Sequence, residues 1–560
     1  MGSENVGGLN IMSKVLFIIP PNMTYDRFVH PAFNERVSVK KSGSYGSPIT
    51  DMPLGVLSMS AYLKKHAEVE IKLLDFNLIL NKTDNFKYDS FAALYRDHFS
   101  ANIKGEFDPD IIAISVLFTT QYSNMMDIAD AARDMFPDTM IIAGGGVPTN
   151  LYKKIFKEST SFDALCFGEG EKPLLELVQA KDKRELLRTH PSWITKDKAA
   201  GQDHFKNDCI IDLDEIPFYD YGILDLDAYL LSPTLTNYAN FESNSHLFHY
   251  MTSRGCPYRC CFCASHTVHG RKMRYYSINR VREDFIRLKD QFKAKIINFQ
   301  DDNLMANKER IHEIINIANG LNLQLYFQNG VTMHSLDRKM LEAMKSAGVT
   351  DLVLPIESGS NRVLHDIMHK PADLEIVKQV VDDCRQLGID TDANILIGLP
   401  GETKQDIEDT RAFLKTLDAN WFRIVVASPL VGSEMYDICV EKNYLSSDDI
   451  DCDYKHAVVN TEEFTAEFIE KTAYSLNLEI NFVYNSDFRL GNYNKALERF
   501  ENTIKVKADH AFAYYFAAKC YQMLGLDSEY EAYKKKYQEL MEGSVFWQDY
   551  ATKFNLLPLS

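Results

Sequence analysis

Short apolar segments rich in β-branched residues alternate with helical patterns along most of the chain, and this alternation restricts the possible folds more than any other feature. The first block of alternation runs from residue 14 to about residue 185. Its apolar runs, such as 14–20 (KVLFIIP), suit strands that are buried on both faces of a parallel sheet. Strands that alternate with helices in this way predict an α/β fold, here an open, doubly wound, Rossmann-like domain.

A second block begins at His246 and contains six predicted strands. They are 246–252, 295–300, 323–328, 351–356, 391–397 and 422–428. Six βα units are too few for a complete eight-stranded barrel, so they predict a partial (β/α)6 barrel with one open side. In barrels of this kind the chemistry takes place at the carboxyl ends of the strands.

The two blocks and the segments around them divide the chain into five predicted parts. These are a leader or tag at 1–13, a Rossmann-like domain at 14–185, a linker at 186–245, a partial barrel at 246–470 and a C-terminal α-helical region at 471–560. In the last part Gly491 and Gly525 lie 34 residues apart, which is the period of tetratricopeptide repeats. Ala496 and Phe500 occupy positions where such a helix pair packs. One repeat and a fragment are visible, so these helices could either cap the barrel or contact a protein partner.

The charge of the chain restricts its partners. The sequence has 61 basic and 79 acidic residues, for a net charge of −18. An acidic chain of this kind is not expected to bind nucleic acid, which requires a basic stripe. It also has neither the run of about 18 apolar residues that spans a membrane nor a secretion signal, so a cytoplasmic location is expected.

Four of the ten cysteines lie within eight positions, from Cys256 to Cys263, which indicates metal binding in a reducing compartment rather than a disulfide framework. The spacing Cys256-x-x-x-Cys260-x-x-Cys263 supplies three thiolates, one fewer than a 4Fe-4S cluster usually has. One iron would therefore stay open, as in a catalytic metal site. A zinc knuckle is the alternative, although no second ligand pair follows. Cys261 is not expected to be a ligand.

The cysteine motif, with Phe262 directly before the third cysteine, resembles the signature of the radical S-adenosylmethionine (SAM) superfamily. Further segments at the ends of the predicted strands resemble the same superfamily; they are 299–303, 328–330, 356–360 and 396–403. The resemblance implies a 4Fe-4S cluster on Cys256, Cys260 and Cys263. It also implies that SAM is bound by Phe262, Asp301, Gln328, Glu357 and Ser358. Glu357 would hold the ribose or the amino group of SAM. Residues 429–433 (PLVGS) depart from the family pattern, which leaves the substrate rim undefined.

Glycine-rich segments follow two strands of the first block, at 144–146 and 168–171. They are not the dinucleotide fingerprint, because Thr149 stands where its third glycine should be. Their order resembles the cobalamin-binding domain that precedes the barrel in cobalamin-dependent radical SAM enzymes. The resemblance implies cobalamin contacts from Ser115, Thr119, Gly144, Gly145, Gly146, Pro148 and Glu169. No Asp-x-His-x-x-Gly motif supplies a histidine to cobalt, and a domain of the same shape that binds nothing is the alternative.

The resemblance implies a cobalamin-dependent radical methyltransferase. In this hypothesis the reduced cluster cleaves SAM, a 5′-deoxyadenosyl radical removes hydrogen from an unactivated carbon of a small-molecule or carrier-bound substrate, and methylcobalamin supplies the methyl group. An external electron donor, such as a flavodoxin or ferredoxin, would reduce the cluster. A second hypothesis keeps the radical but ends in cyclisation, rearrangement or oxidation, with or without cobalamin. A third is a non-catalytic, metal-stabilised scaffold whose helical tail binds partners.

Overall fold

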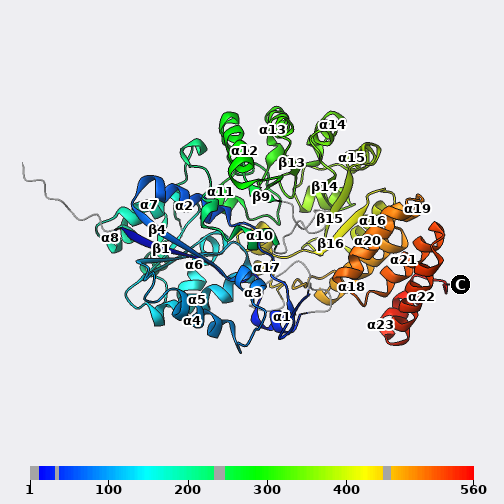
Figure 1. Cartoon of the computed structure of the whole chain (residues 1–560), viewed down its shortest axis with the longest axis horizontal. Helices are drawn as coiled ribbons and strands as arrows, with labels where there is room; N and C mark the ends of the chain where they lie inside the picture. The colour runs from blue at the N-terminus through cyan, green and yellow to red at the C-terminus, as the bar shows by residue number, and fades with distance from the viewer. Residues whose placement is uncertain (1–11, 32–36, 203, 232–245, 446–455, 560) are drawn as a thin grey trace, which may run out of the picture.

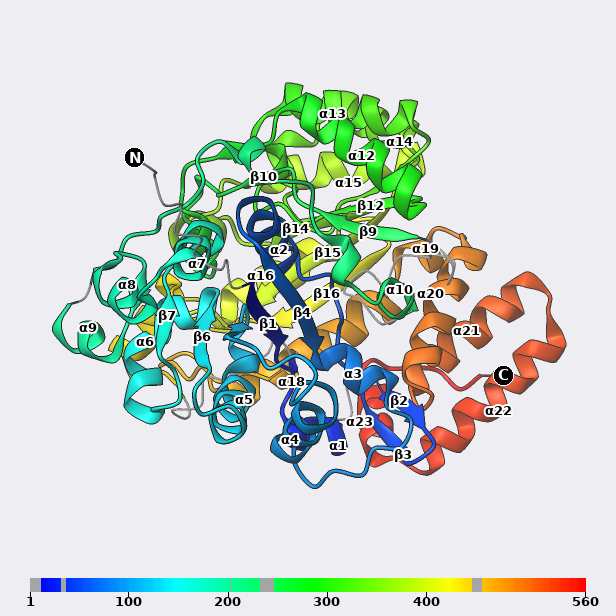
Figure 2. The same ribbon diagram turned by 60° about the vertical axis from the view of Figure 1, so that its left-hand side comes forward.

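The computed structural model describes residues 12–31, 37–202, 204–231, 246–445 and 456–559. An N-terminal α/β domain, a barrel and a C-terminal group of helices follow one another along the chain (Figure 1). The C-terminal helices lie on the other side of the barrel from helices α5 (Tyr122–Met135) and α8 (Lys183–Thr189) of the N-terminal domain (Figure 2). The predicted leader at 1–13 lies outside the described residues except for its last two positions.

The N-terminal domain contains one six-stranded sheet. Its strands, in spatial order, are β4 (Val69–Asp75), β1 (Ser13–Ile19), β5 (Ile111–Ser115), β6 (Met140–Gly144), β7 (Ala164–Cys166) and β8 (Trp193–Ile194). The first five are parallel. Alternate residues of β1 enter two different apolar cores: Leu16 and Ile18 pack on one face of the sheet, and Val15 and Phe17 on the other. This burial on both faces confirms the predicted doubly wound domain.

The sheet extends past residue 185, where the sequence pattern places the domain boundary. Strand β8 pairs antiparallel with β7, so the start of the predicted linker belongs to the N-terminal sheet. The later part of that segment is also packed rather than free. Tyr221 is fully buried and its hydroxyl donates to the carbonyl of His249 in the barrel (2.6 Å), while the hydroxyl of Tyr229 donates to Asp75 (2.6 Å). Residues 232–245 of the predicted linker lie outside the described residues.

All six predicted barrel strands are present. They are β9 (Leu247–Tyr250), β12 (Ile296–Phe299), β13 (Gln324–Tyr326), β14 (Asp351–Glu357), β15 (Asp390–Ile397) and β16 (Trp421–Val426). They form two parallel three-stranded sheets, β9-β12-β13 and β14-β15-β16; within the described chain no strand pairing joins β13 to β14. The intervening helices are α12 (Ile278–Phe292), α13 (Lys308–Gly320), α14 (Arg338–Ser346), α15 (Leu374–Leu387) and α16 (Lys404–Leu414). One continuous apolar core joins both sheets to these helices.

The C-terminal region is helical, as predicted. It consists mainly of α18 (Ala466–Leu478), α20 (Tyr493–Val506), α21 (Ala511–Leu524), α22 (Asp527–Glu542) and α23 (Val545–Lys553). Ala496 and Phe500 are fully buried between α20 and α21. The predicted boundary at residue 470 divides α18, which packs on β16, so this helix belongs structurally to the barrel.

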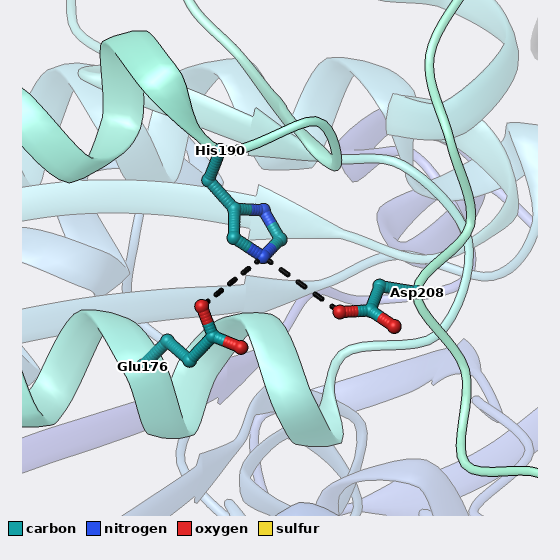
Figure 3. A group of neighbouring side chains, drawn as sticks. All are labelled: Glu176, His190 and Asp208. Atoms are coloured by element: carbon teal, nitrogen blue, oxygen red, sulfur yellow. Dashed lines mark ion pairs between the residues drawn. The ribbon is translucent and has the colours of Figure 1, made fainter.

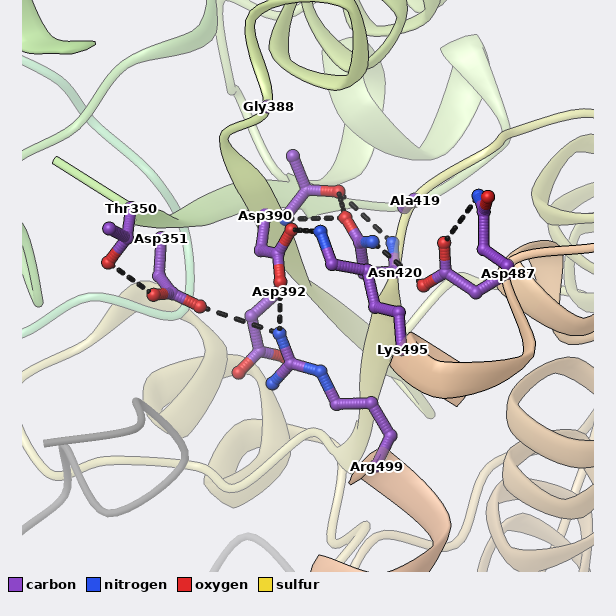
Figure 4. Close-up of polar contacts among 12 residues, drawn as sticks. Thr350, Asp351, Gly388, Asp390, Asp392, Ala419, Asn420, Asp487, Lys495 and Arg499 are labelled. Atoms are coloured by element: carbon purple, nitrogen blue, oxygen red, sulfur yellow. Dashed lines mark hydrogen bonds and ion pairs between the residues drawn. The ribbon is translucent and has the colours of Figure 1, made fainter. Parts of the chain in front are cut away.

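Charged side chains fasten α20 to the amino-terminal end of the barrel strands (Figure 4). Arg499, which is 9% exposed, lies 3.0 Å from Asp390 and 3.4 Å from Asp351, and Lys495 also contacts Asp390. Both aspartates begin a strand, so the helices brace the end of the barrel that is opposite to the expected catalytic end. Among the described helices, none has the length and apolar character required to cross a bilayer.

Candidate active site

The loop that carries the three predicted cysteine ligands follows the first barrel strand and is closed at its base by a short hairpin. Its two sides, β10 (Ser253–Arg254) and β11 (Arg274–Tyr275), pair in antiparallel fashion and enclose the cysteines. Cys256, Cys260 and Cys263 are half-buried, so their thiols are not sealed in the core. The three thiols therefore lie at the carboxyl ends of the barrel strands, where the chemistry of such barrels takes place.

Cys261 differs from its neighbours because it is only 3% exposed and packs with Leu364 and Met368 in an apolar cluster. Its backbone N–H donates to the carbonyl of Met368 (3.0 Å), and its own carbonyl accepts from Met435 (2.9 Å). This side chain anchors the loop to the barrel, in agreement with its exclusion as a ligand.

The three cysteines fit an iron cluster better than one zinc ion. A tetrahedral zinc site, with Zn–S bonds of about 2.3 Å, holds its sulfurs about 3.8 Å apart. In the described part of the chain, the Sγ atoms of Cys256, Cys260 and Cys263 do not all lie within 4.8 Å of one another. Wider spacing suits a cluster in which each thiolate binds a different iron. Burial raises the pKa of Cys260 to about 11, although Lys370 opposes this, so bound iron would have to stabilise the thiolate.

The N-terminal sheet offers a second ligand site at its carboxyl edge. The strand order reverses between β1 and β5, and doubly wound sheets bind ligands at such a point. There the loop after β5 exposes Leu117 (60%) and Phe118 (45%). The side-chain oxygen of Gln121 accepts from the backbone N–H groups of both residues (3.0 and 3.2 Å), and its amide nitrogen donates to Pro20 (2.9 Å). A fixed apolar surface at this position suits the face of a large, flat cofactor.

The same edge of the N-terminal domain contacts the segment that follows the cysteines. The amide of Asn150 donates to the hydroxyl of Thr267 (3.0 Å), and the amide of Asn207 donates to the carbonyl of Val268 (2.5 Å). Gly432, in the segment that departs from the family pattern, also approaches Asn150 so closely that a Cβ atom would lie 2.4 Å from its side-chain oxygen. The ligand-binding edge of one domain therefore lies against the cysteine end of the other.

Comparison with known proteins identifies both halves of this site. Residues 250–414 match the model of the radical SAM superfamily, and residues 51–178 match the model of the B12 binding domain. The chain contains a B12-binding domain followed by a radical SAM domain. This pair of domains confirms the predicted cofactor set of a 4Fe-4S cluster, SAM and cobalamin.

Several curated proteins share most of this architecture. An uncharacterized methyltransferase of Pyrococcus horikoshii is 26% identical over 396 residues, which cover 71% of this chain and 80% of the relative. The cytidylyl-2-hydroxyethylphosphonate methyltransferase of Streptomyces wedmorensis is 24% identical and covers 78% of this chain and 87% of its own. An anaerobic magnesium-protoporphyrin IX monomethyl ester cyclase of Cereibacter sphaeroides is 23% identical, with 68% and 58% covered.

Solved structures show the same fold. The cobalamin-dependent SAM radical enzyme OxsB superposes with a TM-score of 0.61 at 15% identity, covering 98% of this chain and 82% of its own. The radical SAM methyltransferase TsrM of Kitasatospora setae gives a TM-score of 0.57 at 16% identity, with 77% and 76% covered.

Three of the predicted SAM-binding side chains lie half-buried at strand ends of the radical SAM domain. Phe262 is beside the cysteines, Gln328 follows β13, and Glu357 ends β14 with a left-handed φ of +68°. Lys370, which the sequence pattern does not single out, lies 3.2 Å from Glu357 and 5.8 Å from the ring centre of Phe262. The roles of these residues toward SAM remain predictions.

Asp301 and Ser358 are fully buried, and the structure does not support their side chains as cavity-lining groups. The carboxylate of Asp301 accepts hydrogen bonds from the backbone N–H of Thr252 (3.0 and 3.1 Å) and from the hydroxyls of Thr252 and Ser253 (2.8 and 2.5 Å). It therefore holds the strand that leads into the cysteine loop. The hydroxyl of Ser358 is occupied by Thr410 (3.1 Å) and by the backbone N–H of Ser360 (3.1 Å).

The glycine triplet of the B12-binding domain packs against its own protein chain. A Cβ atom on Gly145, whose φ is +106°, would lie 2.4 Å from the carbonyl oxygen of Val116. One on Gly146 would lie 2.9 Å from the carbonyl of Leu117. These glycines therefore allow the loops after β5 and β6 to meet, and their contacts with cobalamin remain predictions.

The other residues predicted to bind cobalamin differ in accessibility. Ser115 and Gly144 are half-buried at the sheet edge, whereas Thr119 and Pro148 are buried. Glu169 is buried as well, and its carboxylate binds Arg254, Arg274 and His269 of the radical SAM domain. Burial alone would raise the pKa of Glu169, but Arg254 and the other cations hold it well below its usual value. The structure therefore does not support Glu169 as a cobalamin contact.

A further cluster, Glu176, His190 and Asp208, has the residue types of a metal site (Figure 3). The Nε2 atom of His190 lies 3.4 Å from Glu176 and 3.9 Å from Asp208. Its Nδ1 atom, however, accepts a hydrogen bond from the backbone N–H of Ser192 (3.1 Å). Burial lowers the pKa of His190 and favours the neutral ring, so the proton sits on Nε2 and faces the carboxylates. An Nε2–H group cannot bind a metal ion, so the cluster is a polar contact between a neutral imidazole N–H and two carboxylates.

A cavity of about 470 Å³ lies between α20 and the amino-terminal ends of the barrel strands, where it is lined by Arg385, Asp390 and Lys495. It is at the opposite end of the strands from the cysteine loop. Because barrel chemistry belongs to the carboxyl ends of the strands, this cavity is not a candidate for the active site.

Proposed function

We propose that the protein is a cobalamin-dependent radical SAM methyltransferase that modifies an unactivated carbon of a small-molecule or carrier-bound substrate. The observation that carries the proposal is the position of the cysteine loop against the carboxyl edge of the B12-binding sheet. Methyltransferases among the relatives favour methyl transfer over the other hypotheses.

The chain supplies the groups that would bind and orient the cofactors. When bound, the cluster supplies the electron that cleaves SAM, and cobalamin supplies a carrier for the methyl group. Cys256, Cys260 and Cys263 would hold the iron. The amide of Asn303 lies 3.8 Å from the sulfur of Cys256, and the hydroxyl of Ser265 lies 3.3 Å from that of Cys263, so both can orient a thiolate.

On the SAM side, Glu357 would accept hydrogen bonds from the amino group or ribose of SAM, and the ammonium of Lys370, 3.2 Å away, fixes the position of this carboxylate. In the B12-binding domain, Leu117 and Phe118 would pack against the corrin and exclude water from that side. These groups would hold both cofactors near the contact between the two domains.

The test is anaerobic reconstitution with iron, sulfide and cobalamin, followed by incubation with SAM and a chemical reductant. Methyl transfer to cobalamin produces S-adenosylhomocysteine, and radical generation produces 5′-deoxyadenosine; mass spectrometry detects both. The proposal expects both products. Formation of 5′-deoxyadenosine alone, with no bound cobalamin, would support the cyclase or rearrangement hypothesis. The similarity to the magnesium-protoporphyrin cyclase is the reason to test this hypothesis. Formation of neither product would support the scaffold hypothesis.

We further propose that an acidic redox protein, such as a flavodoxin or ferredoxin, delivers the electron at the cysteine loop. Arg259 and Lys272 are exposed there, and Arg271 is half-buried. Within the described chain none of these three cations has a carboxylate partner, although the protein as a whole is strongly acidic. Unpaired positive charge beside the cluster suits an acidic donor. The reducing environment that such chemistry requires supports a cytoplasmic location.

The double variant Arg259→Glu/Lys272→Glu tests this entry point. It should slow reduction by flavodoxin and leave reduction by dithionite unchanged. The rate with flavodoxin should also fall with added salt in the unmodified enzyme and lose this dependence in the variant. Equal losses with both reductants would contradict the proposal.

A further inference from the structure

Two arginines face each other at the base of the cysteine loop. Arg254 is the direct cross-strand partner of Arg274 in the β10–β11 hairpin, and both are almost fully buried (3% and 6% exposed). Like charges directly opposite one another destabilise a strand pair. The hairpin that closes the cysteine loop can therefore hold its shape only if other groups neutralise this pair.

The neutralising groups come from the B12-binding domain. Glu169 accepts hydrogen bonds from Arg254 (2.9 Å) and from Arg274 (3.0 Å), with a second bond to Arg274, and its other oxygen contacts Nδ1 of His269 (2.8 Å). Glu171 accepts from Arg254 (2.7 Å) and from Ser58 (2.5 Å). The side chains of both glutamates are at most 4% exposed, so these are charge-assisted bonds shielded from water.

Arg254 is close to the first cysteine ligand. Gly255 separates it from Cys256, and with a φ of +93° and a Cβ position 2.6 Å from the carbonyl of Lys272, this residue can hardly be anything other than glycine. The N–H of Gly255 donates to Asp302 (3.1 Å), and the N–H of Cys256 donates to the carbonyl of Gly270 (3.3 Å). A rotation of the Arg254 side chain would therefore be transmitted through a tightly packed backbone to the cysteine.

The glutamates are also connected to the edge proposed to bind cobalamin. Glu169 follows Gly168, whose N–H donates to the hydroxyl of Thr149 (3.1 Å) in α6 (Gly146–Glu158). Helix α6 begins at the glycine triplet and packs against the helix α11 (His266–His269) that follows the cysteines. A continuous series of contacts thus runs from the sheet edge, through Glu169, to the cysteine loop.

We propose that Glu169 and Glu171 are positioning residues that hold the cysteine loop in a defined orientation to the B12-binding domain and couple the environment of the cluster to the cobalamin edge. This proposal rests on the proposed function, because it assumes a cluster and a cobalamin at the two ends of the contact series. Loss of either negative charge leaves the two facing arginines under-neutralised, and the hairpin beneath the cysteines then changes its geometry.

Glu169→Gln and Glu171→Gln test the proposal in the reconstituted full-length protein. Both variants should retain iron and bound cobalamin. The electron paramagnetic resonance spectrum of their reduced cluster, with and without SAM, should differ from that of the unmodified protein. Formation of 5′-deoxyadenosine should fall about 10-fold, the size of effect expected for partners that orient a metal ligand. Glu169→Asp, which keeps the charge, should restore part of the unmodified spectrum.

Asp163→Asn is the matched control. Asp163 pairs with Arg133 (2.7 Å) within the B12-binding domain and accepts from the N–H of Ile141 (2.8 Å), so its loss destabilises that domain without touching the cysteine loop. The proposal is overturned if Glu169→Gln lowers the melting temperature as Asp163→Asn does while its cluster spectrum stays unchanged. If Glu169→Gln does not fold, Arg274→Lys can be used instead. It keeps the positive charge but cannot form the bidentate hydrogen bonds that Arg274 donates to Glu169.

The spectroscopic readout needs no turnover. An unmodified protein that assembles a cluster but forms neither 5′-deoxyadenosine nor S-adenosylhomocysteine would refute the proposed function alone. The comparison of cluster spectra between Glu169→Gln and Asp163→Asn would still decide the positioning role.

Discussion

The stability of the radical SAM domain should fall as the pH rises above 6, because Glu402 is a buried carboxyl that is held mainly in its neutral form. This residue lies in the turn after β15 and is fully buried. One oxygen accepts from the N–H groups of Gly398 (2.6 Å) and Leu399 (3.1 Å), while the other has no hydrogen-bond partner in the described chain. Burial raises the pKa of Glu402 from 4.5 to about 8.

The sign of the effect follows from proton binding. Between pH 4.5 and pH 8 the folded protein keeps a proton on Glu402 that the unfolded chain releases, so the free energy of unfolding decreases as the pH rises. At 1.36 kcal/mol per pKa unit, the decrease between pH 6 and pH 9 amounts to about 3 kcal/mol. Above pH 8 the carboxylate is charged in both states, and the decrease levels off.

Glu402→Gln removes the titration and keeps the shape, because an amide oxygen can accept the same two backbone hydrogen bonds. Thermal unfolding of the apoprotein at pH 6, 7, 8 and 9 should show a melting temperature that falls more steeply for the unmodified protein than for Glu402→Gln. Glu463→Gln, at an exposed position, should follow the unmodified protein. Parallel pH curves for the unmodified protein and Glu402→Gln would refute the argument.

Three further outcomes are expected. Cys260→Ala should lose bound iron, whereas Cys261→Ala should retain it and lose only stability, as measured by iron content and melting temperature. Gly145→Ala should lower the free energy of unfolding by about 2–4 kcal/mol, because its φ of +106° and the nearby carbonyl leave no room for a Cβ atom; a smaller shift would mean that the loops can separate. Arg499→Ala should lower the stability of the C-terminal helices by about 3 kcal/mol, because Asp351 loses its arginine and Asp390 keeps only Lys495; hydrogen exchange in α20 should rise, whereas exposed Lys505→Ala should leave it unchanged.

The strands could be predicted from the sequence because their signal is local. The run at 14–20 is apolar at every position, and β1 sends alternate residues into two cores, which is the arrangement such a run requires. The spacing of Cys256, Cys260 and Cys263 is local as well, since one loop supplies all three. The local pattern does not show how the elements pack against one another. The predicted domain boundaries at 185 and 470 therefore both fall inside packed structure.

The partners of polar residues at strand ends could not be predicted from the local sequence. Asp301, Ser358 and Glu169 do follow strands, as predicted, but the local pattern does not say which groups their side chains meet. Asp301 is bonded to residues 48 and 49 positions away, and Glu169 to arginines 85 and 105 positions away. A buried carboxylate is stable only with such partners, and partners so distant in sequence leave no local pattern.

Leu117 and Phe118 were not singled out by the sequence pattern. Both lie just after β5 and are exposed, and the side chain of Gln121 holds their backbone N–H groups. The edge of the B12-binding domain thus has two uses. On its β5 side, Leu117 and Phe118 form an exposed apolar surface. On its β7 side, Glu169 and Glu171 form ion pairs with the radical SAM domain. One sheet edge can serve both purposes because its polar residues dock against the radical SAM domain, while its apolar residues remain available to the cofactor.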